Sequence, residues 1–519
     1  MIMVNIIRVE ASKCRAIKWV RQHPFLALHI LYFLVLSSLG ALALWAAPKA
    51  EPLTFPDALY NAVSALTETG LASVPMHRFS LPDQITLLLL MVVGGQVFTS
   101  AIPLFLRRLS FLRRSGDKFP LSPSQEQWVA LPHTTNHQKK ELEYEALVIM
   151  SWLTACYYVF CILTGFMVCQ ICVVRSSHAS VVLKQSHVNS GLFSIFAVVS
   201  AYGNCGYILL DENMVPLQRS WVMLLCLGTL MLMGNTLYAP TLRFWIWLLH
   251  KRAKEERKQV YACILQSKNR RFTHIFPRNE TFWLVGTVVF WNACQVMCML
   301  GIDWRCEALK GLGVGYKLVV ALFQSIAART GGMNVVDLYE LSAPTLFLAL
   351  VAMYVASYPI RIINEPDQKP RGNVFVAELW KLRRKESFLF VATFLACCFE
   401  RESLRDDPLN FSFFNILYEI ISAYGNVGLT IGYNCSLKEA VATHSLKCKD
   451  IPCAFSGRWS LGGKAVLILV MLFGRHRNLL EDIDWDIAPH HDLLVQQAKT
   501  DEPNYIEFFS KPNGTTNSC

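Results

Sequence analysis

Four short polar segments that contain glycine interrupt an otherwise apolar chain of 519 residues. They read SALTETGL at residues 64–71, SAYGNCGY at 200–207, IAARTGGM at 326–333 and SAYGNVGL at 422–429. Each segment is too polar for a membrane span, and each has hydrophobic runs on both sides. Any fold of this chain must therefore accommodate four polar segments between apolar ones.

The composition is that of a protein with several membrane spans. Hydrophobic residues make up 53% of the chain and charged residues 17%, and the mean hydropathy is +0.33, which lies outside the usual range of soluble domains. A bilayer core requires about 20 apolar residues. Candidate spans lie near residues 25–47, 83–106, 145–173, 217–249, 281–301, 342–364, 386–399 and 462–480. The first is longer than the apolar part of a signal peptide, so it is interpreted as a span.

The net charge of +11 does not indicate a nucleic-acid partner, because the basic residues lie in alternate loops. Basic stretches near 8–22, 106–118, 250–271 and 381–385 each border a candidate span. Loops rich in Lys and Arg stay on the cytosolic side of a membrane. All four stretches can be cytosolic only if two spans separate each consecutive pair. We therefore expect a multi-pass protein of the plasma membrane. Its expected partner is the lipid bilayer, and we expect no nucleic-acid partner.

The spans and polar segments divide the chain into four repeats of the same layout, and internal repeats of this kind define a fold. We assign repeat 1 to residues 25–107, repeat 2 to 143–249, repeat 3 to 281–364 and repeat 4 to 386–482. The segments expected in the cytosol are the N-terminal 1–24, the loops 108–142, 250–280 and 365–385, and the C-terminal tail 483–519. The predicted fold class is an all-α polytopic membrane protein.

Each repeat contains a half-length apolar stretch directly before its polar segment. These stretches are FPDALYNAVSAL at 55–66, SGLFSIFAVVSA at 190–201, GYKLVVALFQSIAA at 315–328 and FSFFNILYEIISA at 411–423. They are too short to cross a bilayer, so both ends must face the same side. Irregular backbone at membrane depth is tolerated only where it is buried in protein or lines an aqueous cavity. The four polar segments are therefore predicted to share one aqueous axis.

The glycines of the four segments can be aligned. The aligned residues are Thr67, Glu68, Thr69 and Gly70; Gly203, Asn204, Cys205 and Gly206; Arg329, Thr330, Gly331 and Gly332; and Gly425, Asn426, Val427 and Gly428. Glycine adopts positive φ without a steric penalty, which allows successive carbonyls to face an axis. A ring of carbonyls replaces the hydration shell of an alkali cation. The sequence thus predicts a cation filter, with K+ or Na+ bound at Gly70, Gly206, Gly332 and Gly428.

Packing glycines are the alternative interpretation of these positions. Glycine is common in membrane helices because it permits close helix approach. This explanation is adequate for a single motif, but four glycines in matching positions favour a filter. Glu68 could ligate a cation or point behind the filter, and its role is left open.

The polar segments and the residues that follow them resemble those of the plant HKT cation transporters, within the wider Trk/Ktr/HKT superfamily. SAYGNVGLTIGYNCS and GRWSLGGKAVLILVMLFGR are similar to the fourth HKT repeat, and NCGYILLDENMV with MGNTLYAP to the second. RTGGMNVVDL and MYVASYPI are nearer to microbial and fungal Trk patterns, and TETGL is closer to bacterial Ktr sequences. The resemblance covers most of residues 20–480.

The resemblance implies eight transmembrane helices and four re-entrant pore helices around a pseudo-fourfold central pore, assembled as a homodimer. In that family a serine at the first filter glycine accompanies Na+ selectivity, and a glycine accompanies K+ permeation alongside Na+. Gly70 therefore implies conduction of both ions. A Na+-selective uniporter and a Na+-coupled K+ symporter remain alternatives, because the same pore could serve either.

Arg475 ends the last apolar run, and two interpretations of it stay open. A terminal arginine commonly extends toward the cytosolic surface. Counted from Lys464, however, the span has risen only about 16 Å at Arg475, which is near the middle of a bilayer. A charge at that depth indicates function. The matching arginine of the superfamily lies below the filter and limits cation flux. Lys464 and Arg458, at the outer end of the span, are expected to be solvated.

Other functional classes find no support in the sequence. Motifs of hydrolases, nucleotide-binding proteins and zinc enzymes do not stand out, so we expect neither an enzyme nor a cofactor. A receptor or an intramembrane enzyme would need full spans without polar interruptions or paired ionisable groups within spans. Cys435, Cys448 and Cys453 share one outer loop, where two of them can form a disulfide whose pairing stays open.

Overall fold

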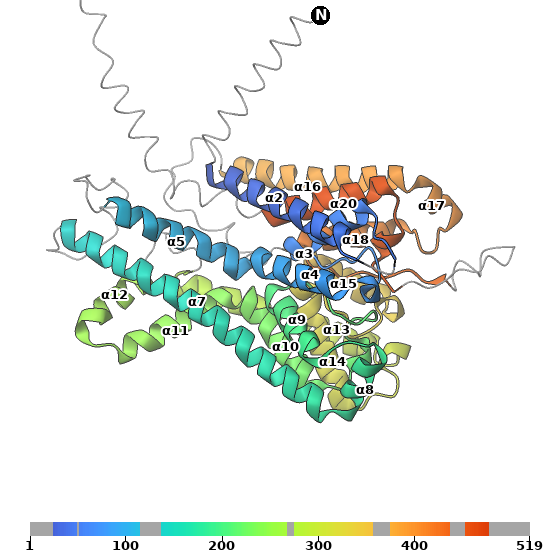
Figure 1. Cartoon of the computed structure of the whole chain (residues 1–519), viewed down its shortest axis with the longest axis horizontal. Helices are drawn as coiled ribbons and strands as arrows, with labels where there is room; N and C mark the ends of the chain where they lie inside the picture. Colours follow the sequence, from blue (N-terminus) through green and yellow to red (C-terminus); the bar gives the residue numbers. More distant parts are fainter. Residues whose placement is uncertain are drawn as a thin grey trace, which may run out of the picture. The chain divides into compact units, whose positions relative to one another are not determined.

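The structure is a computed structural model that describes residues 24–48, 51–114, 136–266, 275–355, 374–435 and 452–476. Every regular element in these residues is a helix, so the predicted all-α class is confirmed for the part described (Figure 1). Nearly all of these helices belong to one compact unit, formed by Ile30–Lys118 and Trp128–Arg477. The second unit, Met1–His29, Phe119–Gln127 and Asn478–Cys519, lies almost wholly outside the described residues.

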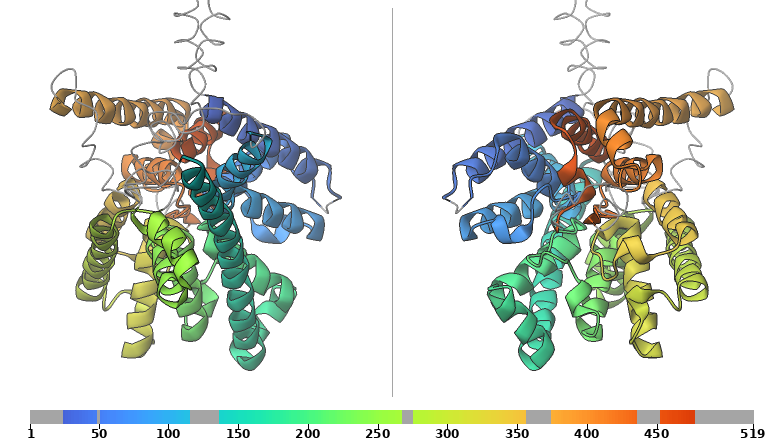
Figure 2. Two further views of the ribbon diagram at one scale, coloured as in Figure 1. Left: turned by 90° about the vertical axis from the view of Figure 1, so that its left-hand side faces the viewer. Right: turned by 90° about the vertical axis from the view of Figure 1, so that its right-hand side faces the viewer.

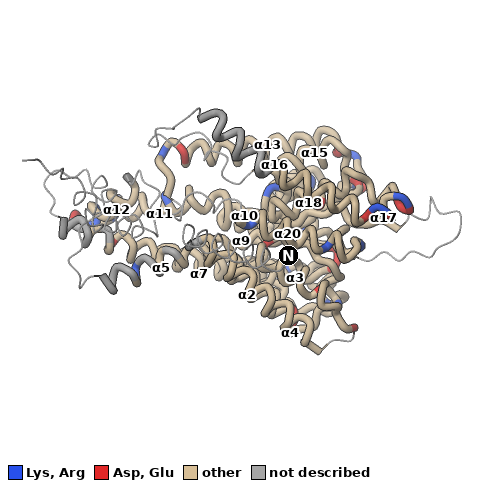
Figure 3. The backbone as a smooth tube through the Cα atoms, turned by 90° about the horizontal axis from the view of Figure 1, so that it is seen from above, with Lys and Arg blue, Asp and Glu red and all other residues tan. Residues whose placement is uncertain are grey.

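Each predicted repeat begins with a long helix. These helices are α2 (Pro24–Ala46), α7 (Asn136–Arg175), α13 (Arg278–Ile302) and α16 (Val374–Phe399). Among the described residues, α2, α7 and α13 are long and apolar enough to cross a membrane as single helices. Most of the helical tube carries no charge, and Lys, Arg, Asp and Glu lie mainly toward helix ends (Figure 3).

The four half-length stretches are helices close to their predicted bounds. They are α3 (Phe55–Leu66), α9 (Ser190–Gly203), α14 (Val314–Ile326) and α18 (Phe413–Gly425). Local caps explain three of the starts, since the side chains of Thr54, Asn189 and Ser412 accept backbone N–H groups of the first turn. Gly313, before α14, has no side chain to do so.

Two second spans differ from expectation because they are broken rather than continuous. α4 (Leu81–Gly94) meets α5 (Gln96–Arg114) at 54°, and α10 (Trp221–Gly234) meets α11 (Tyr238–Arg252) at 82°. The other two predicted second spans correspond to α15 (Ala343–Tyr354) and α20 (Leu461–His476). The structure describes only Val355 directly after α15, and the residues directly after α20 lie outside the described part.

Each break directly follows a glycine that lies close to the backbone of a half-length helix. A Cβ on Gly94 would overlap the carbonyl oxygen of Leu66, and one on Gly234 would overlap that of Tyr202, so each glycine lies against the end of a half-length helix. Helices bend sharply at such points because the regular hydrogen bonds are interrupted. Tyrosine hydroxyls stabilise the carbonyls beside the breaks. Tyr32 donates to Val93 O at 3.0 Å, and Tyr157 donates to Met233 O at 2.9 Å.

The half-length helices pack in a cycle within the large unit. α3 packs against α20, α9 against α4, α14 against α10 and α18 against α15. Each thus contacts the second span of the preceding predicted repeat, and the first repeat contacts the fourth. Figure 2 shows the four groups of helices, blue, green, yellow and orange, around a common centre.

Short elements connect these helices. They are α8 (Ser177–Gln185), α12 (Glu255–Gln266), α17 (Arg401–Asp406) and the single turns Met76–Arg78, Val215–Leu217, Glu307–Leu309, Leu338–Glu340 and Phe455–Arg458. Helix therefore occupies part of the predicted loop 250–280. Cys435 is in a disulfide whose partner lies outside the described residues. Cys448 also lies outside the described residues, and the thiol of Cys453 is free. The predicted segments 1–24, save Pro24, and 483–519 also fall outside the described residues, as do 115–135 of the predicted loop 108–142 and 365–373 of the predicted loop 365–385. The rest of the loop 365–385 is helical, because α16 begins at Val374.

Candidate functional site

The aligned glycines of the polar segments all have positive φ. The angles are +74° at Gly70, +95° at Gly206, +63° at Gly332 and +90° at Gly428. Side chains rarely tolerate this region of backbone space. Four glycines predicted from spacing alone therefore share one unusual backbone conformation.

The same glycines also bring the four segments into backbone contact. A Cβ at Gly70 would overlap Cys205 O, one at Gly332 would overlap Val427 O, one at Gly428 would overlap Thr69 O, and one at Gly206 would lie 3.1 Å from Gly331 O. The first segment thus meets the second, the second the third, the third the fourth, and the fourth the first. The structure brings the four predicted glycines together in a closed ring.

Hydrogen bonds from backbone amides to serine hydroxyls orient two carbonyls of this ring. The amide of Gly206 donates to Ser200 Oγ, and that of Gly428 donates to Ser422 Oγ, both at 3.1 Å. In a trans peptide the N–H and C=O groups point in opposite directions. The carbonyls of Cys205 and Val427 therefore point away from their own helices and toward the neighbouring segment.

Three of the four segments share a second conformational feature. Glu68, Asn204 and Asn426, two residues before the glycine, are left-handed with φ of +59°, +63° and +51°. The third segment differs, because a π-helical turn over Ala327–Gly331 includes Arg329 and Thr330, whose side chains are buried. The predicted equivalence of the four segments thus holds for the glycines but not for every residue before them.

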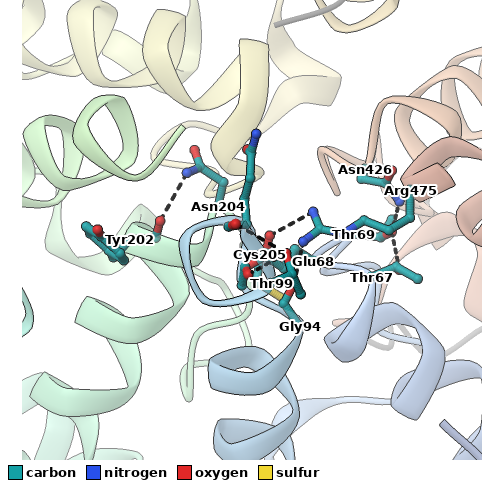
Figure 4. A network of polar contacts seen from close by, with 12 residues as sticks. Thr67, Glu68, Thr69, Gly94, Thr99, Tyr202, Asn204, Cys205, Asn426 and Arg475 are labelled. Atoms are coloured by element: carbon teal, nitrogen blue, oxygen red, sulfur yellow. Dashed lines mark hydrogen bonds and ion pairs between the residues drawn. The ribbon is translucent and has the colours of Figure 1, made fainter. Parts of the chain in front are cut away.

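Side chains behind the ring connect the first and fourth segments. The hydroxyl groups of Thr67 and Thr69 are 2.8 Å apart, and Asn426 donates to Thr69 Oγ1 at 2.9 Å (Figure 4). Asn426 also donates to Met471 O in α20 at 3.0 Å. These bonds hold the segment Thr67–Gly70 in place from outside the ring.

Glu68 and Arg475 form a buried ion pair beside this network. Arg475 Nη1 lies 3.0 Å from Glu68 Oε2, and the two side chains are 13% and 3% exposed. Arg475 Nη2 donates to the carbonyl of Gly94 at the break after α4, and the guanidinium centre lies 5.8 Å from the Phe33 ring centre. Arg475 therefore reaches the first polar segment, and its side chain is largely buried rather than solvated.

Sequence reasoning missed a motif that places Arg475. The second spans contain MVVGG at 91–95, MLMGN at 231–235, MYVAS at 353–357 and MLFGR at 471–475. Gly474 lies against the carbonyl of Tyr424 as Gly94 lies against that of Leu66. Arg475 thus occupies the position that Gly95 occupies in the first repeat, directly after the glycine that contacts the half-length helix. This spacing was visible in the sequence.

The start of α20 also differs from expectation. Lys464 Nζ lies 2.7 Å from Asp57 Oδ1, and their side chains are 13% and 17% exposed. Lys464 is therefore paired and largely buried rather than solvated. Arg458 lies over the Tyr433 ring at 4.9 Å. Among the described residues, no cluster of three or more His, Cys, Asp and Glu side chains could hold a metal ion.

Comparisons with known proteins agree with this architecture. The profile of the TrkH family, described as "Cation transport protein", matches residues 3–365 and 373–448. The chain is 33% identical over 484 residues to "Cation transporter HKT1;1" of Oryza sativa subsp. japonica, covering 88% of this chain and 87% of that protein. It is 31% identical over 440 residues to "Sodium transporter HKT1" of Arabidopsis thaliana, covering 81% and 86%.

Two other similar proteins have lower sequence identity to this chain. "Potassium transporter TRK1" of Candida albicans is 28% identical over 412 residues, which are 72% of this chain and 37% of that protein. The crystal structure of the potassium transporter TrkH from Vibrio parahaemolyticus superposes with a TM-score of 0.50 at 14% identity, covering 89% of this chain and 85% of that one, and it supports the fold alone. With this profile match and these identities, the chain belongs to the TrkH family of cation transport proteins, a family of membrane transporters rather than enzymes.

Proposed function

We propose that this protein conducts K+ and Na+ through a pore whose narrowest part is the ring of Gly70, Gly206, Gly332 and Gly428. The observation that carries the proposal is the closed backbone contact of these four glycines, each with positive φ. The carbonyls beside them, those of Thr69, Cys205, Gly331 and Val427, are the proposed cation ligands. Carbonyl oxygens held by a rigid backbone can replace the water around an alkali ion.

Helix dipoles support a cation at this place. α3, α9, α14 and α18 all end at the polar segments, so the partial negative charges of four helix C-termini converge there. The favourable field adds to the carbonyl ligands without any ionised side chain in the ring. This arrangement suits a monovalent ion that must bind and leave quickly.

The proposed pore has four membrane-pore-membrane repeats around a pseudo-fourfold axis, with eight transmembrane helices and four pore helices. The cyclic packing of α3, α9, α14 and α18 against neighbouring second spans supports this arrangement. The protein is proposed to be a multi-pass homodimer of the plasma membrane that needs no cofactor.

Arg475 is the proposed barrier to cation flux in this pore. Its guanidinium lies close behind the first filter segment, within reach of Glu68 and Gly94. A fixed positive charge at this depth repels a passing cation strongly, because the surroundings screen it less than water does.

The choice between K+ and Na+ depends on Gly70. A glycine at this position supports conduction of both ions, as the HKT resemblance implies, and the relatives include a sodium transporter and a potassium transporter by name. The alternatives are a Na+-selective uniporter and a Na+-coupled K+ symporter with the same fold.

Voltage-clamp recording in a heterologous cell tests the proposal. We expect the reversal potential to shift when either external K+ or external Na+ is changed alone. A shift with Na+ only would support the Na+-selective uniporter, and a current that requires both ions together would support the symporter. Absence of any cation current from protein present at the cell surface would refute the proposed function.

A further inference from the structure

The second and fourth polar segments share a pattern that the first and third lack. Both read SAYGN, at residues 200–204 and 422–426, and in both the serine lies six residues before the ring glycine. Ser64 occupies this position in the first segment and Ile326 in the third. Because each segment contacts the next one around the ring, the second and fourth segments lie on opposite sides of it. The two similar segments therefore form one opposite pair.

In this pair a serine hydroxyl holds the amide of the ring glycine. Ser200 Oγ accepts the N–H of Gly206, and Ser422 Oγ accepts the N–H of Gly428, both at 3.1 Å. The amide of a ring glycine and the carbonyl of the residue before it belong to the same rigid peptide plane. Both serine side chains are fully buried, so water does not replace them as acceptors. Each hydroxyl therefore resists rotation of a plane that carries one proposed cation ligand.

The ring amides of the other two segments depend on main-chain acceptors. The amide of Gly70 donates to the main-chain carbonyl of Ser64 at 3.4 Å, and not to the Ser64 hydroxyl. This distance is long for an amide hydrogen bond. The amide of Gly332 donates to the carbonyl of Ala327 at 2.9 Å, within the π-helical turn of the third segment. Side-chain support of the ring amides is thus confined to the second and fourth segments.

A second side-chain anchor follows the same division. Asn204 donates to Met231 O at 3.1 Å, and Asn426 donates to Met471 O at 3.0 Å. Each of these carbonyls belongs to the second span of the same repeat, in α10 or α20. The first and third segments have no asparagine at the matching position. The second and fourth segments are therefore held by the side chains of one serine and one asparagine each.

We infer that Ser200 and Ser422 are positioning residues for cation selectivity, because they fix one opposite pair of ring carbonyls, those of Cys205 and Val427. The inference rests on the proposed function of the pore. If either peptide plane rotates, the ring loses one of its ligands. K+ is the larger ion and needs a more complete replacement of its hydration shell, so its permeability falls more than that of Na+.

The test compares the K+ to Na+ permeability ratio, from reversal potentials, among variants present at the cell surface. Ser200→Ala and Ser422→Ala each remove one hydroxyl. We expect each to lower the ratio about threefold or more, because a buried amide loses its acceptor and its plane is freed. The two serines lie in different repeats, so either variant tests the inference if the other does not reach the surface.

Threonine retains the hydroxyl and provides the conservative variants. Ser200→Thr and Ser422→Thr should keep the ratio within about 1.5-fold of the wild-type value, because the acceptor for the ring amide remains. This rescue separates the hydrogen bond from a purely structural effect of the substitution, which would move the amount of protein at the surface and not the reversal potential.

Two further serines provide matched controls. Ser194→Ala removes an equally buried hydroxyl from the same helix as Ser200, where it donates to Gln170 Oε1 at 2.9 Å, away from the ring. Ser64→Ala removes the serine that matches Ser200 and Ser422 in sequence but does not hold a ring amide through its hydroxyl. Both variants should keep the ratio within about 1.5-fold of wild type.

Three results would overturn the inference and leave the proposed function intact. The first is a wild-type ratio in both Ser200→Ala and Ser422→Ala. The second is an equal shift in Ser64→Ala and Ser194→Ala, and the third is a ratio that falls as far with threonine as with alanine. Absence of cation current from wild-type protein at the cell surface would instead refute the proposed function, and the inference with it.

Discussion

Gly428 lies directly against the backbone carbonyl of Thr69, so the last polar segment of the chain closes on the first. This contact completes the ring, and it leaves no room for a side chain at Gly428. Gly70 and Gly332 contact the following segment in the same way, and a Cβ on Gly206 would lie 3.0 Å from Gly332 O. Substitution of the ring glycines therefore tests directly whether these residues act as a filter.

Replacement of Gly70 by serine should shift permeation toward Na+. The new Cβ would overlap Cys205 O, and φ at this residue is +74°, so the backbone must move and re-aim a carbonyl. The permeability to K+ should fall more than the permeability to Na+, because K+ is the larger ion and needs a more complete replacement of its hydration shell. The reversal potential should become less sensitive to external K+.

Serine at Gly206, Gly332 or Gly428 should also alter permeation. Gly311→Ser is the matched control, since Gly311 has φ of +77° but nothing within 4 Å of its Cβ position. An unchanged K+ to Na+ permeability ratio in all four ring variants would show that these glycines serve packing only.

Arg475→Gln should raise the maximal cation current about threefold or more without abolishing selectivity. The substitution removes a buried positive charge and leaves the carbonyl ring in place. Current at saturating cation concentration, divided by surface protein, is the measurement. Arg458→Gln, which removes an arginine from the turn Phe455–Arg458 before α20, is the control. Equal currents in wild type and Arg475→Gln would contradict a barrier role.

Tyr157→Phe should destabilise the protein by about 1–3 kcal/mol, because the carbonyl of Met233 at the helix break would lose its donor. The melting temperature in detergent should fall accordingly. Tyr158→Phe is the control, since the Tyr158 ring packs edge to face against Tyr202 at 5.3 Å and retains that contact. Equal melting temperatures for both variants would show that the Tyr157 hydroxyl does not stabilise the break.

Asp57→Asn should lower the melting temperature near neutral pH, because it breaks a charged hydrogen bond worth about 1.5–3 kcal/mol. Burial raises the pKa of Asp57, but the hydrogen bonds from Lys464 and Thr54 outweigh it, so the pKa lies below its ordinary value of 3.8. The pair therefore stabilises the fold above pH 3.8, and this stability is lost as the pH falls through the lowered pKa. The difference between variant and wild type should shrink below pH 3.8.

The exposed pair between Arg78 and Glu51 provides the control for Asp57. Its side chains are 31% and 70% exposed, so Glu51→Gln should change the melting temperature little. A difference between Asp57→Asn and wild type that stayed constant from pH 6 to strongly acid pH would argue against the ionised pair.

Epitope tags should show which loops face each side of the membrane. We expect loops 174–188 and 433–460 to face outside and loops 108–142, 251–279 and 365–385 to face the cytosol, from the distribution of basic residues. Tags placed after His187, at the end of α8, and after Lys254, before α12, leave both short helices whole. Labelling of both tags from outside intact cells would refute the four-repeat topology.

The sequence by itself determined the elements whose causes are local. The half-length helix α3 begins and ends where its apolar stretch does, because Thr54 caps it and the polar residues after Leu66 end it. The positive φ of Gly70 and its counterparts was predicted from glycine at matching positions, because glycine adopts positive φ without a steric penalty.

Only the tertiary structure decided which residues meet. The carbonyl of Leu66 lies against Gly94, the last residue of α4, and hydropathy along a single span does not reveal that contact. Glu68 and Arg475 are 407 residues apart, and either could have faced solvent by its sequence neighbours alone. They pair because the cyclic packing of the helices places α20 beside α3, and a buried charge is stable only where an opposite charge reaches it.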